Sequence, residues 1–184
     1  KAGFGRVATA VGAAATAVVA AGATAMVSLT KQAVSAYADY EQLTGGIETL
    51  FGDAADFMVL RAKNAGVSVG MSANEYMETV TDFSASLIQS LGGDTEKAAQ
   101  MADLAITDMA DNANKMGSDI ESIQNAYAGF SKGQYQLLDN LKLGYGGTKT
   151  EMERLLADAE KIAGVKFDIS SYADVVQAIH VMQE

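Results

Sequence analysis

The sequence predicts an all-α fold on two grounds. The 184-residue chain contains no proline, and because proline costs about 3 kcal/mol inside a helix, its absence favours long helices. Apolar residues also recur at spacings of three and four, and capping patterns precede several of these stripes. We therefore expect a long, small-residue-rich hydrophobic helix at the N-terminus, followed by an acidic domain of several helices.

The N-terminal helix is expected between Arg6 and Lys31, where residues 7–30 carry no charge. At about 1.5 Å per residue, this segment would extend roughly 36 Å, which is enough to cross the hydrocarbon core of a bilayer. It consists mostly of Ala, Gly, Thr and Val, so its insertion into lipid would be marginal compared with a Leu-rich span. Two interpretations stay open: a helix packed tightly against other protein, and a membrane-inserting helix.

Small residues four positions apart in this segment would allow two helices to approach closely. The candidate positions for helix packing or membrane contact are Gly12, Ala13, Thr16, Ala17 and Gly22. The apolar run is too long for a secretory signal peptide and continues into helix-forming sequence. Because the chain begins with a lysine rather than methionine, we expect it to be part of a longer polypeptide.

Charge is distributed unevenly along the chain. Residues 1–36 contain three basic residues and no acid, whereas residues 37–184 contain ten basic and 23 acidic residues, a net charge of −13. An acidic domain repels the phosphate backbone, so we expect no specific nucleic-acid binding by it. The basic ends of the first segment could approach anionic lipid. With no cysteine, the chain has no disulfide framework and no thiolate chemistry.

Five helix starts in the acidic domain have a capping residue, and in three of them a glutamate three positions later completes a capping box. They lie at Ser72–Glu75, Asp94 or Thr95, Ser118–Glu121, Thr148–Glu151 and Ser171. Glycines are expected to end these helices, at Gly92-Gly93, Gly117 and Gly164. The apolar stripes that we expect to be buried are Tyr76, Val80, Phe83, Leu87 and Leu91; Ala98, Met101, Ala105 and Met109; Ile123, Tyr127 and Phe130; Met152, Leu155, Leu156, Ala159 and Ile162; and Val175, Val176, Ile179 and Met182.

Between Tyr37 and Gly70 we expect one or two further helices, interrupted at Gly45-Gly46 and ended near residues 64–66. Residues 165–169 have an extended pattern, but this segment is too short to predict a sheet. The sequence thus predicts two domains, a hydrophobic helix over 1–36 and a helical domain over 37–184.

Few residues in the chain suggest catalysis. His180 is the only histidine, so nucleophilic triads and common zinc sites are almost excluded, and we interpret it as a packing or solvent-edge residue. Acidic residues gather at Asp94, Glu96, Asp103, Asp108 and Asp111. We expect these acids to form a solvated helix face opposite the Met/Ala stripe rather than a metal site. We predict no enzyme activity, no cofactor and no metal.

The segment Gly144–Thr150 partly resembles a phosphate-binding loop, because Lys149 and Thr150 follow glycines at an expected helix start. Glycine does not directly precede the lysine, however, and the spacing of the phosphate-loop motif fails. We instead expect a tight loop that lets Tyr145 fold against the helices and Thr148 cap the next one.

Four strings resemble the helical domain of phage tail tape measure proteins, namely Tyr40–Gly52, Met71–Asp94, Gln124–Phe130 and Asp139–Leu156. The Ala/Gly-rich segment before them is also similar to what precedes this domain in that family. The resemblance covers essentially the whole chain, most specifically residues 40–180. It points to siphophages and to related contractile phages or phage-derived particles of Gram-positive hosts.

This resemblance implies a structural role in the virion, in the tail lumen or at the tail tip. Proteins of this family determine tail length during tail assembly, and their apolar segments are thought to help genome delivery through the host cytoplasmic membrane. The implied partners are other copies of the chain, commonly three, the tail tube, and tip or baseplate proteins. No catalytic residue carries over. The acidic part looks compact, so we expect a module near one end of a longer tape measure chain. The alternative is a membrane-anchored helical interaction module or a pore-forming toxin.

Overall fold

The computed structural model describes residues 33–184. The candidate packing positions Gly12, Ala13, Thr16, Ala17 and Gly22 lie outside these residues. The chain divides into two compact units, Lys1–Glu41 and Gln42–Glu184. Residues 33–41 of the first unit are helical, in a helix that covers 33–51. No helix within 33–184 has both the length and the apolar character that a membrane span requires.

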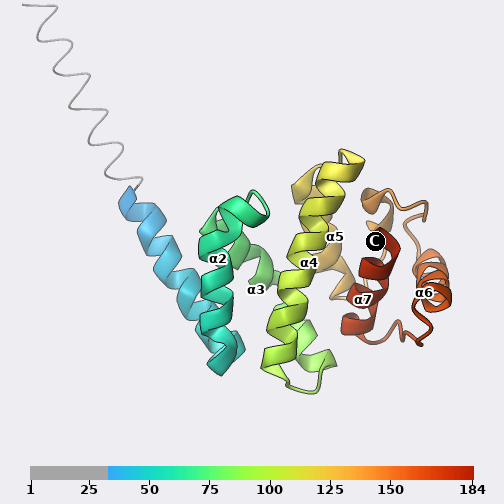
Figure 1. The fold of residues 1–184 in the computed structure, drawn as a ribbon, viewed down its shortest axis with the longest axis horizontal. Helices are drawn as coiled ribbons and strands as arrows, with labels where there is room; N and C mark the ends of the chain where they lie inside the picture. Colours follow the sequence, from blue (N-terminus) through green and yellow to red (C-terminus); the bar gives the residue numbers. More distant parts are fainter. Residues whose placement is uncertain (1–32) are drawn as a thin grey trace, which may run out of the picture. The chain divides into compact units, whose positions relative to one another are not determined.

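The described part of the chain is all-α, as predicted, and contains no strand (Figure 1). After the helix over 33–51, the elements are η1 (Gly52–Ala54), α2 (Ala55–Ser68), α3 (Ala73–Ser90), α4 (Thr95–Met116), α5 (Ile120–Phe130), η2 (Leu138–Leu141), α6 (Lys149–Ala163) and α7 (Tyr172–Gln183). Residues 165–169, which have an extended pattern, belong to the connection between α6 and α7.

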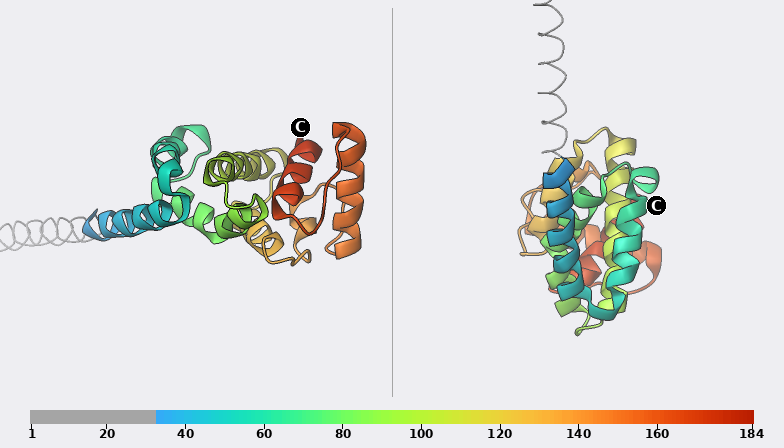
Figure 2. Two further views of the ribbon diagram at one scale, coloured as in Figure 1. Left: turned by 90° about the horizontal axis from the view of Figure 1, so that it is seen from below. Right: turned by 90° about the vertical axis from the view of Figure 1, so that its left-hand side faces the viewer.

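Helix α4 lies at the centre of the second unit and contacts α2, α3, α5 and α7. Figure 1 shows α2 and α3 on one side of α4, with α7 on the other side and α6 beyond it. Figure 2 shows α6 and α7 side by side at the end of this unit. The start of α7 is tied to two other helices, because the Tyr172 hydroxyl donates to the Tyr127 carbonyl (3.1 Å) and Ala173 N donates to Ser90 Oγ (3.1 Å).

The predicted interruption at Gly45-Gly46 is wrong, because the helix over 33–51 passes through both residues. The break comes at Gly52, whose φ of 52° is a left-handed conformation that glycine adopts readily. A glycine inside a helix costs only about 1 kcal/mol relative to alanine. Burial of Ile47 and Phe51 on this helix offsets that cost. The predicted end near residues 64–66 is also too early, since α2 continues to Ser68.

Three of the predicted helix starts are confirmed as stated. Ser72 Oγ accepts from Glu75 N (3.2 Å) and Glu75 Oε2 accepts from Ser72 N (3.4 Å), which completes the capping box of α3. Asp94 caps α4 and Ser171 caps α7. The glycine stops after α4 and α6, Gly117 and Gly164, are confirmed as left-handed C-caps.

The prediction of a capping box at Ser118 is wrong. Asp119 caps α5 instead, with its carboxylate accepting from Ser122 N at 2.9 Å. The box at Thr148 is half formed: Thr148 Oγ1 accepts from Glu151 N (3.2 Å), but the glutamate accepts from Gly146 N rather than from the threonine's own amide.

Most residues of the predicted apolar stripes are buried, with Tyr76, Val80, Phe83 and Leu87 of α3 all in the core. Leu91, Met101 and Met182 are half-buried instead. Ile162 contradicts the prediction, because its side chain is 67% exposed. It lies in the last turn of α6, just before Gly164 ends the helix, and the described residues leave this turn uncovered.

Candidate functional site

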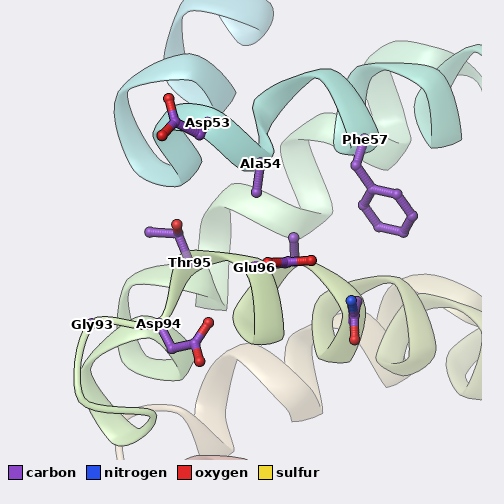
Figure 3. Close-up of a pocket in the computed structure, with 9 residues that line it drawn as sticks. Asp53, Ala54, Phe57, Gly93, Asp94, Thr95 and Glu96 are labelled. Atoms are coloured by element: carbon purple, nitrogen blue, oxygen red, sulfur yellow. The ribbon is translucent and has the colours of Figure 1, made fainter.

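A groove with a volume of about 620 Å³ separates η1 and the start of α2 from the α3–α4 turn and the first turns of α4 (Figure 3). We call it the α2–α4 groove. Its lining residues are Asp53, Ala54, Phe57, Gly93, Asp94, Thr95, Glu96, Ala99 and Gln100. In Figure 3, Ala54 of η1 and Phe57 of α2 lie on one side of the groove. Asp94, Thr95 and Glu96 lie on the opposite side.

Local sequence explains the position of these side chains. On α2 the buried residues are Ala55, Met58, Ala62 and Ala65, spaced by three and four positions. Phe57 falls outside this stripe, so its ring stands at the groove edge and is 40% exposed. On the other side of the groove, α3 ends at Gly92-Gly93 in left-handed conformations, and the chain turns directly into α4.

The charges of the groove are only partly balanced. Asp94 accepts from Lys97 N (3.0 Å) and pairs with Lys97 Nζ (2.9 Å), and these contacts lower the pKa of Asp94 and raise that of Lys97. Within residues 33–184, no hydrogen bond or ion pair is formed by the carboxylates of Asp53 and Glu96. The groove therefore combines an exposed aromatic ring with two unpaired acids.

One turn beyond the groove, a polar cluster links α2, α3 and α4. Nε and a terminal nitrogen of Arg61 each lie 2.7 Å from an oxygen of Asp103, and the Tyr76 hydroxyl donates to the same carboxylate at 2.7 Å. Burial, together with Asp103, raises the pKa of Tyr76. The prediction that Asp103 belongs to a solvated face is wrong, because it is half-buried and holds three helices together.

A second polar cluster links α4 and α7. Asp108 is only 6% exposed, and its two carboxylate oxygens lie 3.0 and 3.1 Å from Nδ1 of His180. Nε2 of His180 lies 3.5 Å from Glu184. Burial raises the pKa of Asp108, although His180 acts in the opposite direction. The expectation of a solvated face is therefore wrong for Asp108 as well, while Glu96 and Asp111 are exposed as predicted.

The Gly144–Thr150 segment forms the tight loop that was predicted. Tyr145 is buried and its hydroxyl lies 3.0 Å from Asp158 of α6. The guanidinium carbon of Arg154 lies 4.6 Å from the centre of the Tyr145 ring, and Arg154 also pairs with Glu151 at 2.8 Å. A Cβ at Gly147 would collide with the backbone carbonyl of Gln136, so this close approach requires glycine.

No group of three or more His, Asp and Glu side chains within residues 33–184 is arranged to hold a metal ion. Comparisons of the chain with protein-family models, with curated proteins and with solved structures each found no match.

Proposed function

We propose that this chain is a segment of a phage tail tape measure protein, with a structural role in tail length determination, tail assembly and genome delivery through the host membrane. The main observation behind this proposal is that one chain combines a charge-free, small-residue segment over 7–30 with an acidic, all-helical module. A segment rich in small residues suits both a protein-lined tube and lipid. An acidic module would pass DNA without adhering to it.

The strings that resemble tape measure proteins overlap several helices and the turns between them, and Met71–Asp94 contains a whole helix. Met71–Asp94 contains α3 with its N-terminal cap, its glycine stop and the cap of α4. Asp139–Leu156 contains most of η2, the Tyr145 loop and the first half of α6.

Within such a protein, the described module would be a folded part rather than the measuring rod. Its longest helix between η1 and the C-terminus, α4, has 22 residues and therefore extends about 33 Å. The helices pack around one another instead of following end to end. We therefore assign the module to the tail lumen near one end of the tape, or to the tip, in contact with other copies, the tail tube, and tip or baseplate proteins.

A membrane-anchored interaction module or a pore-forming toxin is the second candidate, which the apolar segment over 7–30 favours. Mass spectrometry of purified tail particles and of membranes from the producing cells separates the two. The proposal predicts peptides of this chain in the particles, at several copies per tail. Recovery from membranes of cells that contain no particles, together with absence from tails, would contradict it.

A further inference from the structure

One arginine in this unit, Arg154, already contacts an aromatic ring and a carboxylate at the same time. The guanidinium carbon of Arg154 lies 4.6 Å from the Tyr145 ring centre, and a terminal nitrogen of the same residue lies 2.8 Å from Glu151. A guanidinium is planar and weakly hydrated, so it stacks on the ring while its N–H groups face the carboxylate. This arrangement shows which groups hold an arginine side chain in this protein.

The α2–α4 groove presents the same kinds of group without a guanidinium. The exposed ring of Phe57 stands at one side, and the unpaired carboxylate of Glu96 lies on the other side (Figure 3). Asp53, also unpaired, adds a second negative charge at the rim. The volume of the α2–α4 groove, about 620 Å³, is within the range of roughly 300–1,000 Å³ that is usual for ligand sites.

Two basic residues beside the groove already have acidic partners. Lys97 pairs with Asp94, and Arg61 pairs with Asp103 one turn further along. Residues 42–184 contain ten basic and 21 acidic residues, so a cation that approaches this unit meets an attractive field. Neither of these two cations is free to balance Asp53 and Glu96, so the groove leaves its negative charge open to a cation from another molecule.

We propose that the α2–α4 groove binds an arginine side chain of a partner protein, with its guanidinium stacked on Phe57 and paired with Glu96. Asp53 strengthens the attraction from the rim. Arginine fits better than lysine, because its flat guanidinium satisfies the ring and the carboxylate at the same time, as Arg154 does on α6. This inference goes beyond the proposed tail function and does not depend on it.

The test uses the full ¹⁵N-labelled chain in an NMR titration with N-acetyl-arginine amide, and with N-acetyl-citrulline amide as the neutral isostere. The arginine probe is expected to shift the backbone amides of residues 53–57 and 94–100, whereas the citrulline probe leaves them in place. Glu96→Gln should weaken arginine binding about fivefold. Lys97→Gln should strengthen it about twofold, because it removes a competing cation.

Glu78→Gln is the matched control, since it removes the same charge from an exposed position of α3 that does not line the groove. The proposal predicts that this variant binds the arginine probe as the wild type does. Three results would overturn the proposal: no shifts in the groove, equal shifts with citrulline, or equal weakening by Glu78→Gln and Glu96→Gln. The last result would mean general attraction to an acidic surface.

Discussion

The pair between Asp108 and His180 allows a sharp test of how α7 is held on α4. Replacing His180 by alanine leaves the buried Asp108 carboxylate without its partner, whereas Asp108→Asn removes the charge and leaves a neutral polar group at the same place. Breaking a buried pair from one side costs about 3–5 kcal/mol in general. Because His180 is partly exposed and water reaches its edge, we expect the lower limit, about 3 kcal/mol, for His180→Ala at pH 7.

The same geometry predicts an asymmetry between the two variants. Asp108→Asn should cost only about 1 kcal/mol, because a neutral amide needs less compensation than a buried charge. In urea denaturation of the full chain followed by circular dichroism, an m-value of about 2 kcal/mol/M makes 3 kcal/mol a shift of roughly 1.5 M in midpoint. Asp108→Asn should shift the midpoint by about 0.5 M.

The stability of the His180→Ala variant should also depend on pH, with a sign fixed by the raised pKa of Asp108. A carboxyl whose pKa is higher in the folded state favours folding when protonated. This contribution is complete below the unfolded pKa and is lost as pH rises through the folded value. Without the histidine, the carboxyl protonates more readily still, so His180→Ala should gain stability between pH 7 and pH 5 relative to the double variant Asp108→Asn/His180→Ala, which lacks this carboxyl. Equal costs for His180→Ala and Asp108→Asn at pH 7, or no gain of His180→Ala over the double variant as the pH falls, would refute this reasoning.

Four further substitutions test local features by the same unfolding assay. Gly147→Ala should destabilise the module by about 1–3 kcal/mol, because the added Cβ meets a backbone carbonyl; wild-type stability would contradict the close approach. Tyr76→Phe should cost about 1.5–3 kcal/mol through loss of the hydrogen bond to the Asp103 carboxylate, and a neutral result would mean that this bond contributes nothing. Asp119→Ala should cost about 1 kcal/mol as the loss of a helix cap. Ser118→Ala should be neutral or stabilising, since its buried hydroxyl has no hydrogen-bond partner; the reverse order would restore Ser118 as the cap.

Local rules predict most of the helices because helix starts and stops are decided within a few residues. The hydroxyl of Ser72 and the left-handed glycines at 117 and 164 act on amides and carbonyls of their own helix, so the sequence alone reveals them. Capping is less certain where two candidates are adjacent. Ser118 and Asp119 both satisfy the capping pattern. The Asp119 carboxylate makes the capping hydrogen bond, although Ser118 is the residue with a glutamate three positions later.

The polar clusters were not predictable, because they depend on how many sides of a helix are covered. A stripe at Ala98, Ala105 and Met109 describes a helix that packs on one side. Helix α4 is instead contacted from several sides, which buries Asp108 and half-buries Asp103 on flanks that the stripe assigns to solvent. Their partners lie 72 and 42 positions away in sequence, and no local pattern signals them.

The α2–α4 groove was missed for a related reason. Phe57 is a large aromatic residue, which composition assigns to the core, but it lies off the buried stripe of α2. The register of α2 could not be read from the sequence, because Phe57, Leu60 and Val67 form a more apolar stripe than Ala55, Met58 and Ala62 and yet are exposed. The acids across from Phe57 could not be matched to it, because that requires the packing of α2 on α4.

The tail function itself is tested most directly by deletion of residues 7–30 from the parent gene and measurement of tail length by electron microscopy. Tails shorter by about 36 Å, the rise of 24 helical residues, would place this segment within the ruler. Tails of normal length that adsorb but fail to deliver DNA would assign it to the membrane step. Ala17→Arg is the length-preserving control, which keeps the ruler but costs roughly 2.5–3.5 kcal/mol of membrane insertion. We predict one of these two defects; infectious tails of unchanged length would contradict the proposed function.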